Sequence, residues 1–258
     1  MKILCIGDIV SHDGAEYLCR KLPHLRREYG ADAIIVNGEN SALGNGIDKT
    51  SYDMIMSAGA DVVTGGNHSF QKRTAGDLHD EEKRLIRPAN VKCFDSGKGE
   101  ILLDMGRYKL HIINLSGSLY MKEECENPFV CAENMLENYT DCINIVDFHA
   151  EATSEKQAMG FFLDGKASLV YGTHTHIQTN DAQILDGGTG YVTDIGMTGV
   201  KKSILGKALA CCINNFVNPE NRMRIEDAKG QCQLCGVFAE IDEKTKKCTH
   251  IELINIDN

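Results

Sequence analysis

The chain has 258 residues, of which 42% are hydrophobic, so it is long enough to bury a large core, and we expect one domain over residues 1–258. Its formal net charge of -10 argues against a long nucleic acid as partner, because phosphate backbones are normally bound by clustered Lys and Arg. Eleven cysteines could suggest a disulfide framework, but the chain is not a small domain and lacks a signal-peptide pattern, so we expect a reduced, cytoplasmic protein. No apolar run reaches about 20 residues, so we expect no membrane contact.

Six apolar runs that end in polar or Gly-rich turns predict buried strands. They lie at residues 2–10, 31–36, 61–63, 110–115, 144–148 and 168–171. Apolar residues at helical spacing predict helices at 15–29, 50–58, 132–139 and 154–163, and Pro23 would break or kink the first of these. Glycines within 91–115 indicate antiparallel hairpins, and a charged turn at 242–247 joins two last strands, 236–241 and 250–256. The pattern predicts a mixed α/β fold.

Polar residues with the chemistry of metal ligands follow five of these strands at their C-terminal ends, where open α/β sheets place their sites. In chain order they are Asp8, Glu39, Asn40, Asn67, His68, His149, His174 and His176. Carboxylate and amide oxygens together with imidazoles suit manganese, iron or zinc better than calcium. Two cations would need a bridging carboxylate, for which Glu39 is suited. His174 and His176 would face one side of an extended segment, or serve neighbouring metals from a loop.

Other motifs have a structural interpretation. Taken singly, a histidine is usually a surface or hydrogen-bonded core residue, and His12, His24, His79, His111 and His250 keep that interpretation. The glycine-rich segments at 44–46 and 187–190 do not follow a phosphate-loop pattern and are interpreted as loops, the first beside the substrate pocket. Cys232 and Cys235 have the spacing of half a zinc site or a redox pair, but no second such pair accompanies them, which favours buried strand cysteines.

The order and separation of the motifs resemble those of calcineurin-like metallophosphoesterases across most of the chain. The matching motifs are Gly7-Asp8, Gly38-Glu39-Asn40, Gly66-Asn67-His68, His149 and Gly172-Thr173-His174-Thr175-His176. Segments 37–42, 147–156 and 193–199 are similar to the bacterial YmdB-like branch, whose studied members are 2',3'-cyclic nucleotide phosphodiesterases. The resemblance therefore implies a four-layer α/β/β/α sandwich of the metallo-dependent phosphatase type.

The resemblance also implies two divalent or mixed-valence metal ions per chain, which would be iron, manganese or zinc. In that scheme the first ion is held by Asp8, Glu39 and His176, with Asn40 nearby, and the second by Glu39, Asn67, His149 and His174. His68 would donate a proton to the leaving oxygen or hold the phosphate. The expected reaction is attack of a hydroxide held between the metals on a small phosphoester, above all a 2',3'-cyclic nucleotide, in a homo-oligomer.

Three positions depart from the family pattern. Val10 stands where most of the superfamily has a histidine ligand, and Glu39 where it has Asp, although Glu is usual in the narrower branch. Ala15 stands where the branch has an arginine after a Gly-rich turn, so this position supplies no cation for the substrate. Two alternatives stay open, namely a phosphatase or phosphodiesterase of broad specificity and a regulatory scaffold that acts through protein partners.

Overall fold

Two mixed β-sheets form the centre of the computed structural model, which describes residues 1–257. The strand order of the first sheet is β2-β11-β12-β1-β3-β4, with β13 paired to β12. Its strands are β1 Lys2–Ile6, β2 Asp8–Ile9, β3 Ala33–Asn37, β4 Val62–Thr64, β11 Met197–Val200, β12 Cys232–Ile241 and β13 Cys248–Asp257. The second sheet has the order β5-β6-β7-β8-β10-β9. Its strands are β5 Glu100–Asp104, β6 Lys109–Ser116, β7 Ile143–His149, β8 Leu169–Thr173, β9 Gln183–Ile184 and β10 Gly190–Val192.

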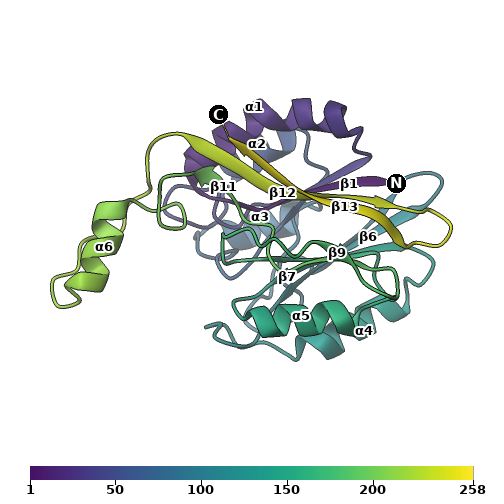
Figure 1. The fold of residues 1–258 in the computed structure, drawn as a ribbon. Coiled ribbons are helices and arrows are strands. Elements are labelled where there is room, and N and C mark those ends of the chain that lie inside the picture. The colour runs from purple at the N-terminus through teal and green to yellow at the C-terminus, as the bar shows by residue number, and fades with distance from the viewer. Residues whose placement is uncertain (258) are drawn as a thin grey trace.

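Helices cover the outer faces of the two sheets (Figure 1). Helices α1 Ser11–Tyr29 and α2 Lys49–Ser57 lie outside the first sheet, and α4 Pro128–Glu137 and α5 Thr153–Phe162 outside the second. Helix α3 is Ala75–Glu81, and α6, Leu209–Val217, projects away from the layers. The four-layer α/β/β/α order expected from the sequence is confirmed.

Strand β1 shows how the layers are joined, because alternate side chains of a strand point to opposite faces. Leu4 and Ile6 belong to the buried cluster that contains Leu18 of α1, whereas Ile3 and Cys5 belong to the cluster between the sheets. A third cluster lies between the second sheet and its helices. Each fully buried aliphatic side chain contributes roughly 1.5–3 kcal/mol, so the three clusters together stabilise the stack of layers.

All six predicted strands are present, with some changes at their ends. The first divides at Gly7, and the chain continues as β2, which pairs with β11. Only glycine fits at this position, because a Cβ there would lie 2.0 Å from the carbonyl oxygen of Gly196. Pro23 lies inside α1 without ending it. The hairpins β5–β6 and β12–β13 are antiparallel as expected, but residues 91–99 form no regular strand. Within residues 1–257, no helix has the length and apolarity needed to cross a bilayer.

Candidate metal centre

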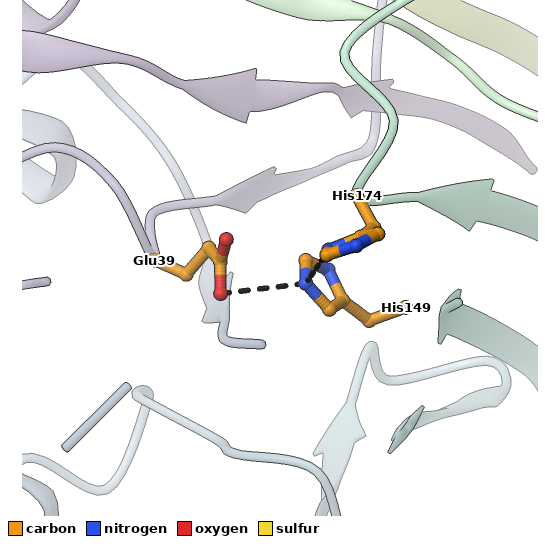
Figure 2. Close-up of side chains that lie close together, drawn as sticks. All are labelled: Glu39, His149 and His174. Atoms are coloured by element: carbon orange, nitrogen blue, oxygen red, sulfur yellow. Dashed lines mark hydrogen bonds and ion pairs between the residues drawn. The ribbon is translucent and has the colours of Figure 1, made fainter. Parts of the chain in front are cut away.

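The expected ligand residues converge where strands of both sheets end. Asp8 begins β2, Glu39 and Asn40 follow β3, and Asn67 and His68 follow β4. From the second sheet, His149 is the last residue of β7, and His174 and His176 follow β8. Figure 2 shows the side chains of Glu39, His149 and His174 pointing toward one another. Strands from both sheets therefore supply the residues of one site.

Possible ligand atoms fall into two groups that share Glu39. One contains Glu39, His149 and His174, and the other contains Asp8, Glu39 and His176, with the atoms of each group within 4.8 Å of one another. All five side chains except that of His174 are buried. A single carboxylate thus lies between two clusters, which is the arrangement that a bridged pair of cations needs.

In the first group, the donor atoms crowd around His149. Its Nε2 lies 2.9 Å from Asn67 Oδ1, 3.1 Å from His174 Nδ1 and 3.4 Å from Glu39 Oε2. The backbone approaches closely here, since a Cβ on Gly66 would lie 2.2 Å from Glu39 Oε2. Oxygen and nitrogen donors that face a common point are suited to a cation such as manganese, iron or zinc.

In the second group, two buried oxygens have no hydrogen-bond partner within residues 1–257, namely Asp8 Oδ1 and Asn40 Oδ1. Asp8 Oδ1 lies 3.8 Å from His176 Nε2, and the Asn40 amide donates to Glu39 Oε1 at 2.6 Å. An unsatisfied buried acceptor costs about 1–3 kcal/mol, so native proteins rarely leave one without a purpose. Unpartnered acceptors beside Glu39 and His176 are what a cation site leaves in a structure without ions, so the residues present fit such a group.

Each of the three histidines has one ring nitrogen held by an acceptor outside the two groups. His149 Nδ1 lies 3.0 Å from Thr173 Oγ1, His174 Nε2 3.0 Å from Glu151 Oε2, and His176 Nδ1 3.2 Å from the carbonyl oxygen of Leu205. If these nitrogens carry the proton, the opposite nitrogen of each ring offers its lone pair to the site. Such contacts fix the tautomer and orientation of histidine ligands.

The titratable groups of the site are buried, and burial disfavours their charged forms. Burial raises the pKa of Asp8 to about 7, with a further contribution from the negative charge of Asp194. Burial, followed by the charge of Asp8, raises the pKa of Glu39 well above its ordinary value. Burial also lowers the pKa of His149, which favours the neutral imidazole that binds metals. Cations would stabilise both carboxylates in the ionised form, so binding should release protons.

A threonine links His149 to a buried aspartate that sequence reasoning missed. The Thr173 hydroxyl donates to Asp147 Oδ1 at 2.7 Å and so is free to accept from His149 Nδ1. Asp147 Oδ2 in turn accepts from Thr64 Oγ1 and Asn37 Nδ2. The available signal was a carboxylate inside the apolar run 144–148, which must be hydrogen-bonded if it is buried.

Replacing Thr173 with Val, which keeps its shape, is expected to weaken metal binding by about 10- to 100-fold, because His149 would no longer be held in one tautomer. The measurement is titration of the metal-free protein with Mn²⁺ or Zn²⁺. Thr173→Ser, which retains the hydroxyl, should bind metal like the native chain. Equal affinities of the Val variant and the native chain would rule out this role for the hydroxyl.

A buried ion pair supports the loop that carries His174 and His176. Both histidines have a positive φ, 97° and 63°, which is strained for residues other than glycine. Asp194 Oδ2 accepts from the backbone nitrogen of Thr175 at 3.1 Å and from its hydroxyl at 2.7 Å. The same oxygen accepts from Lys156 Nζ at 2.6 Å, and both side chains of the pair are 1% exposed. The pair therefore fixes the residue between the two histidines.

Replacing Lys156 with Met is expected to lower the free energy of unfolding by roughly 3–5 kcal/mol, because Asp194 would stay buried without its cation. Urea denaturation of the metal-free protein measures the change. The control is Lys166→Met, which removes an exposed ion pair with Glu133 and should cost no more than about 1 kcal/mol. Equal losses for the two variants would contradict the prediction.

The remaining sequence motifs lie outside the two groups of ligands. His12 is exposed and pairs with Glu16 on α1, and Cys232 and Cys235 are buried, free cysteines of β12. Val10 lines the cavity beside the site but has no ligand atom, and Ala15 is buried in α1. Val10 therefore supplies no ligand atom to the site, and Ala15 supplies no cation.

Comparison with known proteins agrees with this architecture. The family model for YmdB-like proteins matches residues 4–254. A Bacillus subtilis protein named 2',3'-cyclic-nucleotide 2'-phosphodiesterase is 40% identical over 261 residues, which cover 100% of this chain and 98% of that protein.

Two crystal structures share the whole fold. A hypothetical protein from Thermus thermophilus is 34% identical with a TM-score of 0.92, over 100% of this chain and 99% of that one. A novel phosphatase from Mycoplasma pneumoniae is 34% identical with a TM-score of 0.94, over 100% of this chain and 93% of that one. The family resemblance of the motifs is thereby confirmed, and the chain belongs to the YmdB-like family.

Proposed function

We propose that the chain is a dinuclear metal-dependent phosphodiesterase that hydrolyses 2',3'-cyclic nucleotides. The observation that carries the proposal is the position of Glu39, which belongs to both groups of ligand atoms. The name of the Bacillus subtilis relative supports the same class of substrate, since that protein is 40% identical over 98% of its length. Two-metal sites occur in phosphatases and nucleases, where the ions stabilise the attacking and leaving oxygens of the displacement.

The two ions would be held by unequal sets of residues. Asp8, Glu39 and His176 would hold the first, with Asn40 adding its unpartnered oxygen in place of the ligand lost at Val10. Glu39, Asn67, His149 and His174 would hold the second. Iron, manganese and zinc all suit these ligands.

Two such ions would supply a hydroxide nucleophile near neutral pH and neutralise phosphoryl oxygens. The chain's own contribution is to orient the ligands and to move a proton. His68 lines the cavity beside the ligands, and its backbone nitrogen donates to Glu39 Oε2 at 2.9 Å, which fixes its position relative to the bridge. We assign to the His68 imidazole the proton that the departing ribose oxygen needs.

The direct test compares turnover of 2',3'-cyclic, 3',5'-cyclic and noncyclic nucleotides by protein whose metal content is known from elemental spectrometry. The proposal expects two metal ions per chain, loss of turnover after chelation, and preference for the 2',3'-cyclic substrates. Comparable rates on all three classes would favour a broad phosphoesterase instead. Turnover that survives chelation would refute the metal mechanism.

Three further expectations belong to this proposal. A single domain over residues 1–258 and a homo-oligomer remain predictions, the second of which analytical ultracentrifugation would test. A cytoplasmic location also remains a prediction, supported by eleven free cysteines, most of them buried or partly buried, as is usual in reducing compartments. Fractionation of cells would decide it.

A further inference from the structure

An arm formed by residues 205–227 leaves the layered body between β11 and β12 and carries α6 (Figure 1). Its base is tied to the site. The carbonyl oxygen of Leu205 faces His176 Nδ1 at 3.2 Å, while Lys207 Nζ donates to Asp227 Oδ1 at 2.7 Å and to Asn45 Oδ1 at 2.5 Å. The arm is therefore anchored to a proposed metal ligand and to the loop after β3.

A cavity of about 620 Å³ lies between the arm and the metal centre. Ligand pockets for small molecules usually have about 300–1,000 Å³, which is room enough for a nucleotide. The body contributes Glu39, Asn40, His68, His174 and His176, and the arm contributes Cys212, Asn215, Phe216, Arg222 and Ile225. One wall of the cavity thus holds metal ligands, and the other is built by the arm alone.

Arg222 is the cation of this wall that is free to bind an anion. The other cation lining the cavity, Lys207, is neutralised by Asp227. Within residues 1–257, Arg222 has neither an ion pair nor a hydrogen bond from its side chain. Because the chain has a net charge of -10 and Lys207 is already paired, Arg222 is well placed to balance an anionic substrate.

The same wall carries an aromatic ring that is not packed in the protein core. Phe216 is 82% exposed although it lines the cavity, and Ile225 beside the same cavity is 46% exposed. Every nucleobase has a π-face, so an exposed ring beside a phosphate site suits base stacking without strong base preference. Apolar surface combined with a free guanidinium matches a ligand that is both aromatic and anionic, as a nucleotide is.

We propose that the arm is the nucleotide-recognition element of this site, in which Arg222 binds the substrate's phosphate and Phe216 stacks on its base. The inference rests on the proposed function. The metal ligands then serve hydrolysis of the phosphoester, and the arm sets the preference for nucleotides over other phosphoesters.

The experiment measures kcat and KM for a 2',3'-cyclic nucleotide and for glycerol 1,2-cyclic phosphate, which has the ring phosphate but no base. Phe216→Ala should raise KM about 5- to 100-fold for the nucleotide alone. Arg222→Gln should raise KM about 10-fold or more for both substrates. Metal content should stay at the native level in both variants, since neither residue belongs to the ligand groups.

Matched controls come from the same arm. Arg224→Gln and Val217→Ala change exposed residues that do not line the cavity, so both should keep native kinetics. Native KM values in Phe216→Ala and Arg222→Gln would overturn the inference. If Phe216→Ala kept a native KM but changed the oligomeric mass, the exposed apolar residues of the arm would instead bind a second copy of the chain. If the native chain hydrolyses no nucleotide, the proposed function itself fails, which is a different result.

Discussion

Replacing Glu39 with Gln is expected to remove metal from both positions and to reduce phosphodiester hydrolysis by more than about 100-fold. Glu39 is the residue common to both groups of ligand atoms, and a neutral amide cannot supply the negative charge that two cations share. Elemental analysis should therefore show that the variant loses more than one metal ion per chain.

The matched control is Glu151→Gln. Glu151 is 49% exposed and contacts His174 Nε2 at 3.0 Å, so its change should weaken only the ion that His174 holds, by about 10- to 100-fold. Native metal content in Glu39→Gln would exclude the bridging role. Loss of one ion with the other intact would leave Glu39 as a ligand of a single metal.

The stability of the metal-free protein gives a second readout of Glu39→Gln. Burial and the charge of Asp8 raise the pKa of Glu39, so the folded, metal-free protein favours the protonated acid and loses stability as pH rises through that raised pKa. Metal-free Glu39→Gln should therefore resist urea better than the metal-free native chain at pH values where the acid is ionised. If the Glu39 carboxylate had only a structural role, metal-free Glu39→Gln would instead be less stable to urea than the metal-free native chain.

Much of the site can be found from the sequence because parallel strands bring their C-terminal ends to one edge. Asp8, Glu39, Asn67 and His149 each follow or end an apolar run, so their convergence needs only the order of the strands. The positive φ angles of His174 and His176 show that these residues lie in a loop, and the two histidines belong to different ligand groups. This geometry fits the alternative in which the two histidines serve neighbouring metals from a loop.

The supporting contacts could not be predicted, since they depend on strand register and on long-range packing. Thr173 faces His149 because β7 and β8 pair in that register, which no local pattern specifies. The ion pair of Lys156 and Asp194 joins residues 38 positions apart. The position of the arm could not be predicted for a different reason: the residues of α6 are amphipathic, as in a helix packed on a sheet, whereas the helix projects from the layers.

Replacing His68 with Ala is expected to lower kcat on 2',3'-cyclic nucleotides by about 10²- to 10⁴-fold with unchanged metal content. Burial, followed by the charge of His174, lowers the pKa of His68. The acid form exists below this pKa, so kcat/KM of the native chain should fall as pH rises through a value below the ordinary 6.5 of histidine. That limb of the pH profile should be missing in the variant.

A second substrate separates proton donation from binding of the phosphate. A p-nitrophenyl phosphodiester has a leaving group that departs without a proton, so its hydrolysis should be nearly as fast in His68→Ala as in the native chain. Equal losses on both substrates would show that His68 holds the phosphate and donates no proton. His12→Ala is the control, because His12 is an exposed residue that pairs with Glu16, and it should leave both rates unchanged. A native kcat on cyclic nucleotides in His68→Ala would remove His68 from the mechanism.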